Sequence, residues 1–150
     1  MCANGESTSV SSARRGSILI VEDVHYMRLL LRQTLTTMGY EVIEARDGNQ
    51  AATTYRERHD EVVLIMTDIV MPDSDGIECI EKIRSIDKKV PILVVTANPS
   101  KENLVACAKL GISGVVSKPF DRNRFRSKVL ELLSALEPHE SEEVQLEPSS

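Results

Sequence analysis

The sequence is poor in aromatic residues, which make up 3% of its 150 positions and include no Trp. Branched aliphatic side chains must therefore supply most of the packing in any core. The 41% hydrophobic content is ordinary for a soluble globular protein, so neither wholesale disorder nor a fibrous class is indicated. A chain of this length is expected to form one domain.

The sequence also lacks a surplus of positive charge, because its formal net charge is −5. We therefore expect no general basic field and no direct nucleic-acid partner. The three cysteines, Cys2, Cys79 and Cys107, are widely spaced and contain no CxxC pair. This pattern predicts reduced thiols rather than a disulfide framework or a zinc site.

No run approaches the roughly 18 consecutive apolar residues that a membrane span requires. The N-terminal stretch MCANGESTSVSSARRGS lacks the apolar segment of a secretory signal. We therefore expect no membrane insertion and a cytoplasmic location.

Composition divides the chain into three parts. Residues 1–16 are rich in Ser, Thr and Gly without apolar periodicity, and residues 137–150 are similar but acidic. Both predict disordered tails. Residues 17–136 contain no repeat and no internal linker, so they predict a single folded domain.

Short runs rich in Val, Ile and Leu predict five strands. They lie at residues 17–21, 40–45, 62–67, 91–97 and 114–117. Four are nearly continuous apolar runs, as expected for strands covered on both faces, whereas the mixed pattern of 40–45 favours an edge strand.

Apolar residues at helical spacing predict a helix after each strand. The apolar stripes begin at Met27, Ala51, Ile77, Leu104 and Phe125. Gly39 is placed to end the first helix, and Asp121 to cap the last. Five strands alternating with five helices predict an α/β fold, a (βα)5 doubly wound, flavodoxin-like parallel sheet of order 2-1-3-4-5.

Polar residues follow the predicted strands. In such a sheet ligands bind beyond the carboxyl ends of the strands, where the strand order reverses. The residues at these ends are Glu22 and Asp23, Asp68, Thr96, and Lys118. Order 2-1-3-4-5 makes the first and third strands neighbours, so three carboxylates should converge on one crevice.

Crowded carboxylates repel one another unless a cation intervenes. Oxygen ligands of this kind suit Mg²⁺, which keeps several waters and commonly serves phosphate chemistry. Lys118 adds a fixed positive charge. An aspartate, a hard dication, a lysine and a hydroxyl together predict an aspartyl-phosphate site with Asp68 as nucleophile.

Each of these residues also has a structural interpretation on its own. Asp23 could cap a helix, Asp68 could serve a turn, Thr96 could be a strand residue and Lys118 a solvated surface lysine. Their joint placement favours the functional interpretation. Asp73 and Asp75 are assigned mainly to turn formation and capping, and His25 to a solvated helix start.

Four motifs, LIVEDV, TDIVMPDSDG, VVTA and SKPF, occur in this order along residues 17 to about 136. Together they resemble the receiver domain of two-component response regulators. The resemblance implies that Asp68 accepts a phosphoryl group from a sensor histidine kinase or a histidine phosphotransfer protein in a Mg²⁺-dependent reaction.

The resemblance also implies roles for the other site residues. Mg²⁺ would be held by Asp23, Asp68 and the backbone carbonyl of Val70, with Glu22 assisting. On the phosphoryl side, Thr96 would donate a hydrogen bond, Lys118 would form an ion pair and catalyse transfer together with Asp68, and Ala97 would leave space. Two structural features are implied as well, a cis bond from Lys118 to Pro119 and a structural glycine at Gly76.

A receiver of this kind is a switch rather than an enzyme, catalysing only its own phosphorylation and autodephosphorylation. Its signal would leave by protein contact or onward phosphotransfer, through the surface of the fourth helix, fifth strand and fifth helix. A monomer and a phosphorylation-dependent dimer both remain open. Val115 stands where receivers often have Tyr or Phe, which puts signalling by an aromatic flip in doubt, and Ser74 replaces a usually apolar turn residue.

Two other functions fit the fold less well. A phosphatase of the haloacid-dehalogenase type would need a second Asp two residues after the nucleophile, and Val70 stands there. A nucleotide or flavin binder would need a glycine-rich phosphate loop, but no GxGxxG or GxxxxGK follows a strand, and the loop after the first strand is acidic.

Overall fold

The computed structural model describes residues 16–71, 74–97 and 100–134. The tails predicted for 1–16 and 137–150 lie outside these residues, apart from Gly16. Strands and helices alternate in the order β2 Ser17–Val21, α2 His25–Thr37, β3 Glu41–Ala45, α3 Gly48–Arg58, β4 Val62–Thr67, α4 Gly76–Ile86, β7 Ile92–Thr96, α5 Lys101–Lys109, β8 Gly114–Ser117 and α6 Arg122–Ser134.

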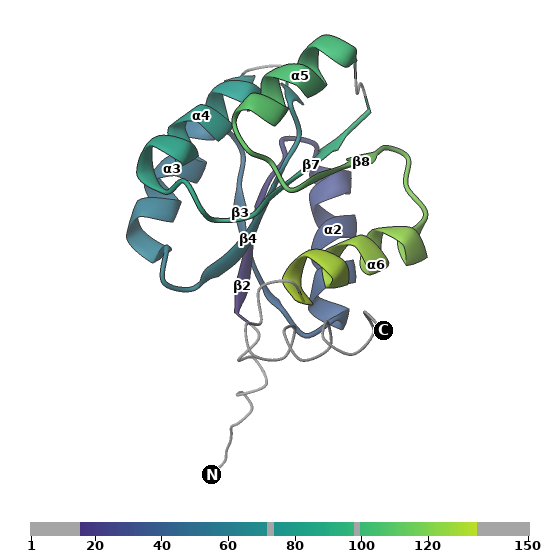
Figure 1. The fold of residues 1–150 in the computed structure, drawn as a ribbon. Coiled ribbons are helices and arrows are strands. Elements are labelled where there is room, and N and C mark those ends of the chain that lie inside the picture. Colours follow the sequence, from purple (N-terminus) through teal and green to yellow (C-terminus); the bar gives the residue numbers. More distant parts are fainter. Residues whose placement is uncertain (1–15, 72–73, 98–99, 135–150) are drawn as a thin grey trace, which may run out of the picture.

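The five strands form one sheet in the order β3-β2-β4-β7-β8, and every neighbouring pair is parallel. This confirms the predicted fold class and the order 2-1-3-4-5. The chain order reverses between β2 and β4, which therefore lie side by side at the switch point (Figure 1).

Helices cover both faces of the sheet, with α2 and α6 on one side and α3, α4 and α5 on the other (Figure 1). Within β2, Ile18 and Ile20 pack with residues of α2 and α6, whereas Leu19 and Val21 pack with residues of α3, α4 and α5. Because successive side chains of a strand point to opposite faces, a strand covered on both sides must be apolar throughout.

The edge strands are less buried than the central ones. β3 is the mixed strand predicted at an edge, and its first four residues are exposed or half-buried. β8 forms the other edge, so its apolar run is only half-buried, unlike the complete cover expected from its sequence. Its position at the end of the sheet explains the difference, since it has one neighbouring strand.

Local signals at the helix ends agree with the sequence. Gly39, with φ of 97°, follows α2 in the left-handed region that favours glycine. The Asp121 carboxylate accepts a hydrogen bond of 2.7 Å from the Asn123 N–H at the start of α6. Asp47 caps α3 in the same way through the Gln50 N–H.

Two short strands were not predicted. β5 Val70–Met71 and β6 Ser74–Asp75 pair antiparallel in a separate two-stranded sheet. The sequence had suggested only a turn here, because two-residue strands are too short to show a period of two. Asp73 lies outside the described residues. Within the described part of the chain, no helix has both the length and the apolar character to cross a membrane.

Candidate functional site

Glu22 follows directly on the central strand β2 and is 1% exposed. Its main-chain N–H donates to the carbonyl of Ala45 on β3 at 3.2 Å, which continues the parallel ladder one residue past the strand. One carboxylate oxygen accepts the N–H of Val24 at 3.3 Å. The carboxylate is therefore held at the carboxyl end of the sheet.

Asp68 follows β4, the strand beside β2. Its N–H donates to the carbonyl of Val21 at 3.3 Å, so the ladder between the two strands ends at this residue. This bond brings Asp68 next to Glu22 at the switch point. Asp68 is 7% exposed, which leaves its carboxylate close to the surface but poorly hydrated.

Lys118 connects these two carboxylates. It follows the edge strand β8, and its main-chain N–H donates to the carbonyl of Thr96 at 2.8 Å. Its Nζ lies 2.9 Å from Oε1 of Glu22 and 2.8 Å from Oδ2 of Asp68. Lys118 lies 96 positions from Glu22 and 50 positions from Asp68 in the chain, and yet the three residues form one ion-pair cluster.

The cluster is unevenly balanced, with two buried carboxylates for one ammonium group. Burial raises the pKa of Glu22, although the hydrogen bond from Lys118 acts in the opposite direction. For Lys118, burial alone would lower the pKa, but the hydrogen bonds to Asp68 and Glu22 outweigh it and the pKa is raised. Lys118 is therefore charged at neutral pH, and the excess negative charge favours an added cation.

Thr96 ends β7 and is fully buried, with Ala97 exposed beside it. The main-chain bond from Lys118 to the Thr96 carbonyl fixes the ends of β7 and β8 relative to each other. Asn98, the next residue toward α5, lies outside the described residues. A hydroxyl and a lysine thus stand at the carboxyl ends of neighbouring strands, as their positions in the sequence predict.

Gly76 packs directly against the main chain of the Asp68 segment. A Cβ at this position would overlap the carbonyl oxygen of Asp68 and the Cα of Ile69. Its N–H also donates to the Ile69 carbonyl at 3.3 Å. Only a residue without a side chain fits there, which gives a physical reason for the structural glycine implied by the resemblance. The bond from Lys118 to Pro119 is cis, the form that the resemblance implies.

The donors at this edge of the sheet suit a hard dication, because they are carboxylates and a main-chain carbonyl. Asp23 is half-buried directly after Glu22, and Val70 lies in β5 two residues after Asp68. Within the described residues, no group of three or more His, Cys, Asp or Glu side chains is arranged to hold a metal ion. The predicted convergence of three carboxylates is therefore not found among these residues, although Lys118 does bring Glu22 and Asp68 together. Asp23 and Asp68 remain the predicted direct ligands, and two carboxylates can suffice because Mg²⁺ commonly takes one or two and completes its shell with waters.

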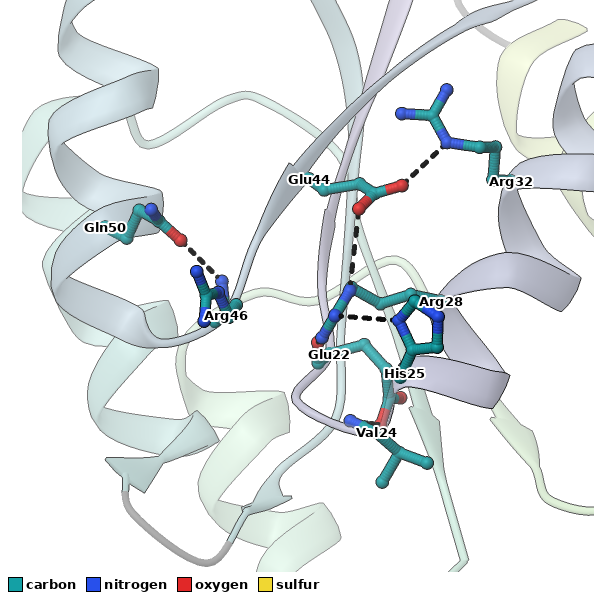
Figure 2. A network of polar contacts seen from close by, with 8 residues as sticks. All are labelled: Glu22, Val24, His25, Arg28, Arg32, Glu44, Arg46 and Gln50. Carbon is teal, nitrogen blue, oxygen red and sulfur yellow. Dashed lines mark hydrogen bonds and ion pairs between the residues drawn. The ribbon is translucent and has the colours of Figure 1, made fainter.

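A second polar network connects the loop after β2 with α2 and β3, and it was not predicted from the sequence (Figure 2). Arg28 of α2 donates to the main-chain carbonyl of Glu22 at 2.9 Å and lies 3.5 Å from Oε1 of Glu44 on β3. Arg32 pairs with the other oxygen of Glu44 at 2.7 Å. His25 is exposed, as predicted, with its Nδ1 3.3 Å from Arg28.

The sequence did contain a signal for this network. Arg28 lies three residues before Leu31 and seven before Leu35, on the buried stripe of α2. A cation on an apolar stripe usually has a buried partner. Glu44, in turn, is one of the polar residues that gave 40–45 its mixed pattern.

Comparison with known proteins gives consistent matches. The family described as "Response regulator receiver domain" matches residues 18–130. The chemotaxis protein CheY of Thermotoga maritima is 35% identical over 108 residues, covering 71% of this chain and 88% of that protein. CheY of Halobacterium salinarum is 33% identical over 118 residues, covering 79% and 97%.

Solved structures agree on the fold. The non-phosphorylated HemR receiver domain of Leptospira biflexa matches with a TM-score of 0.75 and 27% identity, covering 83% of this chain and 98% of that one. A chain in the CheX–CheY–BeF3–Mg complex of Borrelia burgdorferi gives 0.74 and 28%, covering 78% and 88%. The receiver domain of sensor histidine kinase PA1611 of Pseudomonas aeruginosa, solved with magnesium in its active-site cleft, gives 0.71 and 26%, covering 79% and 98%.

Proposed function

This chain belongs to the response regulator receiver family, and on that premise we propose that it is a signalling switch that accepts a phosphoryl group on Asp68. Receivers of this type are signalling domains rather than conventional enzymes, and they interact with histidine kinases and downstream targets. The donor would be a phosphohistidine on a sensor kinase or on a phosphotransfer protein.

The observation that supports this proposal is the position of Lys118 between Glu22 and Asp68. A lysine within 2.8 Å of an Asp68 oxygen stands where the negative charge of an incoming phosphoryl group would develop. The carboxylate itself is buried enough to be poorly hydrated, and such carboxylates are better nucleophiles than fully solvated ones.

In the proposed reaction, an Asp68 oxygen attacks the phosphorus atom of the phosphohistidine. A P–O bond forms as the P–N bond breaks, and the histidine nitrogen leaves with the bonding electron pair and takes a proton from solvent. Lys118 pairs with the transferred group, and the Thr96 hydroxyl donates to it. Hydrolysis of the product, with water as the acceptor, would reset the switch.

We assign Mg²⁺ binding to Asp23, Asp68 and the Val70 carbonyl, with Glu22 assisting. Bound there, Mg²⁺ would neutralise charge on the phosphoryl oxygens. The magnesium in the PA1611 receiver domain supports this assignment for the family. The excess of carboxylates over lysine supports it in this chain.

The signal would pass through α5, β8 and α6 by protein contact. Val105 on α5 and Leu130 on α6 are 46% and 45% exposed. A hollow of about 610 Å³ lies between β8 and α6, and its lining is mixed, with Val116 and Phe120 beside polar and charged residues of α6 and the preceding loop. Apolar side chains at a surface hollow can accept a partner, and the Thr96–Lys118 main-chain bond connects this region to the site.

The central test uses beryllofluoride, a phosphoryl mimic, together with Mg²⁺. In the wild type, amide resonances of Thr96, Ala97 and Lys118 should shift on addition. Asp68→Asn should show no shift, because the acceptor carboxylate is gone. Asp87→Asn makes the same chemical change at a carboxylate that accepts hydrogen bonds from Tyr55, Lys89 and Val90 at the opposite end of the sheet, and it should respond as the wild type does.

The covalent reaction is tested in parallel with phosphoramidate as a small donor. The intact mass of the wild type should rise by one phosphoryl group, and EDTA should prevent the rise. Equal responses of the wild type and Asp68→Asn in both assays would refute the proposed acceptor.

A further inference from the structure

Arg28 of α2 donates a hydrogen bond to the acidic loop, residues 22–24, which connects β2 to α2. Its side chain is only 14% exposed, and one guanidinium nitrogen donates to the main-chain carbonyl of Glu22 at 2.9 Å (Figure 2). This carbonyl belongs to the peptide unit that joins Glu22 to Asp23. A hydrogen bond to it restricts rotation of the whole planar unit.

The hydrogen bond from Arg28 matters because few other contacts restrain the orientation of this peptide unit. The first residue before α2 is Val24, which makes no side-chain capping hydrogen bond. Ser, Thr, Asp or Asn usually occupies that position and orders the chain entering a helix. The remaining bonds of Glu22 hold its N–H, to Ala45, and its carboxylate, to Val24 and Lys118.

Arg28 is itself held in place from the edge strand. Glu44 on β3 lies 3.5 Å from Arg28 and 2.7 Å from Arg32, so one carboxylate is shared by two arginines of α2. This pairing offsets the positive charge of Arg28 close to the acidic residues. Arg28 can therefore act as a hydrogen-bond donor while its effect on a bound cation is reduced.

We propose that Arg28 is a positioning residue that fixes the peptide unit between Glu22 and Asp23 and so directs the Asp23 carboxylate toward Mg²⁺. The inference rests on the proposed Mg²⁺ site and deepens it. Residues that orient metal ligands from outside the coordination shell typically change affinity by about 10- to 100-fold when they are replaced.

The test compares Arg28→Met with Arg32→Met in the absence of any phosphoryl donor. Both variants remove one positive charge from α2 and one partner of Glu44, but only Arg28 contacts Glu22. Mg²⁺ affinity is measured from the amide shifts of Asp23 and Val24 during titration with MgCl₂. Arg28→Met should bind Mg²⁺ at least about 10-fold more weakly than the wild type, and Arg32→Met should stay within about twofold because Arg32 is 46% exposed.

The expected direction separates geometry from charge. Loss of a nearby positive charge alone would strengthen Mg²⁺ binding in Arg28→Met, whereas loss of the peptide anchor would weaken it. Arg28→Lys should recover part of the affinity, because its ammonium group can still donate to the Glu22 carbonyl. Unfolding in urea identifies any variant whose affinity falls only because the protein is unfolded.

A second measurement does not depend on the metal. In the metal-free protein, hydrogen exchange at the Val24 amide, which donates to the Glu22 carboxylate, should be faster in Arg28→Met than in Arg32→Met. The Asp68 amide, bonded to Val21, should exchange alike in both variants.

The outcomes distinguish this inference from the function on which it rests. A wild type that binds no Mg²⁺ would refute the proposed metal site, and the exchange experiment would still decide whether Arg28 holds the loop. A wild type that binds Mg²⁺ while Arg28→Met binds it equally well or more tightly than Arg32→Met would overturn the positioning role.

Discussion

At the amino ends of the strands, Arg84 donates hydrogen bonds to four main-chain carbonyls, whereas at the carboxyl ends Lys118 is shared by two buried carboxylates. The Arg84 acceptors lie in the two connections that precede β7 and β8, at Asp87 and Val90 in the first and at Leu110 and Gly111 in the second. One cation thus organises each end of the sheet, but the charges around it are balanced in different ways.

The cluster at the amino ends has matched partners. The Asp87 carboxylate accepts from the Tyr55 hydroxyl at 2.6 Å and from the Lys89 N–H at 2.7 Å. The Tyr55 hydrogen bond is the main reason why the pKa of Asp87 is lowered. Burial lowers the pKa of Arg84 and raises that of Tyr55. One carboxylate faces one guanidinium group there, and the cluster joins α3, α4 and the entry to β7.

The cluster at the carboxyl ends is short of positive charge, and this imbalance suits the dication of the proposed site, whose charge would in turn offset that of a phosphoryl group. Burial raises the pKa of Glu22 there, which is the opposite of the shift at Asp87. Groups with perturbed pKa values in a cleft commonly mark functional sites. The comparison indicates that the charges at the amino ends are arranged for stability, whereas those at the carboxyl ends are unbalanced at some expense of stability, as the proposed reaction would require.

The largest expected effect contrasts two glycines, one at each end of the sheet. Gly76→Ala would push a Cβ into the Asp68 main chain and should lower the free energy of unfolding by about 3 kcal/mol or more. A Cβ in Gly111→Ala would make only an ordinary contact of 4.0 Å with Nε of Arg84 but must keep a φ of 76°, so a loss of about 1–2 kcal/mol is expected. Urea unfolding of both variants measures the two changes in the free energy of unfolding. Equal changes would show that the main chain of the Asp68 segment can shift to accommodate a Cβ at little cost.

A smaller effect is expected when an aspartate is replaced by asparagine in each cluster in turn. The two replacements should change the free energy of unfolding in different directions. Asp87→Asn weakens the hydrogen bonds from Tyr55 and Lys89 and should destabilise the protein by about 1–2 kcal/mol. Asp68→Asn leaves Lys118 paired one to one with Glu22, so its stability should be unchanged or higher by up to about 1 kcal/mol.

Urea midpoints at neutral pH compare the two asparagine variants directly. Destabilisation of Asp68→Asn to the same extent as Asp87→Asn would contradict the view that the carboxyl end carries excess negative charge. The beryllofluoride response described above serves as the functional control, because it should be lost only in Asp68→Asn.

The smallest effect is a dependence on pH. The folded pKa of Glu22 is raised, so its contribution to stability is complete below the unfolded pKa, near 4.5, and is lost as pH rises through the folded value. The folded pKa of Asp87 is lowered from 3.8, so its contribution is present above 3.8 and is lost as pH falls through the folded value.

Urea midpoints between pH 4.5 and 7.5 test this difference. Relative to Glu22→Gln, the wild type should gain stability as pH is lowered across this range, because only the wild type relieves a buried charge by taking up a proton. Relative to Asp87→Asn, it should show no comparable gain. A wild type that loses stability against Glu22→Gln on acidification would reverse the assigned sign.

Much of the fold could be predicted from the sequence. Strands 17–21, 62–67 and 114–117 were predicted to the residue. The strand predicted at 91–97 is shorter at both ends, because Pro91 has no N–H for the ladder and Ala97 begins the following loop. α3 had the weakest apolar pattern but forms with Asp47 as its cap, a local signal that the apolar spacing alone did not use.

The site could be predicted in part. The positions of Glu22, Asp68 and Lys118 at strand ends follow from the alternation of elements, and the structure brings these three together. Arg28 could not be assigned in the same way. Its spacing along α2 shows that it faces the core, but not which carbonyl of a neighbouring loop it reaches.

The sequence by itself determined the order and type of the elements, the switch point between the first and third strands, and the residue types that stand there. These follow from periodicity and from charge, which are local properties of the chain. Only the tertiary structure decided that Lys118 is shared by Glu22 and Asp68 and that Gly76 lies against the Asp68 carbonyl. It also decided that Arg28 donates a hydrogen bond to the carbonyl of the peptide unit between Glu22 and Asp23. Such contacts depend on how elements cross in space, because a period tells which face of a helix or strand is buried but not which atoms meet it there.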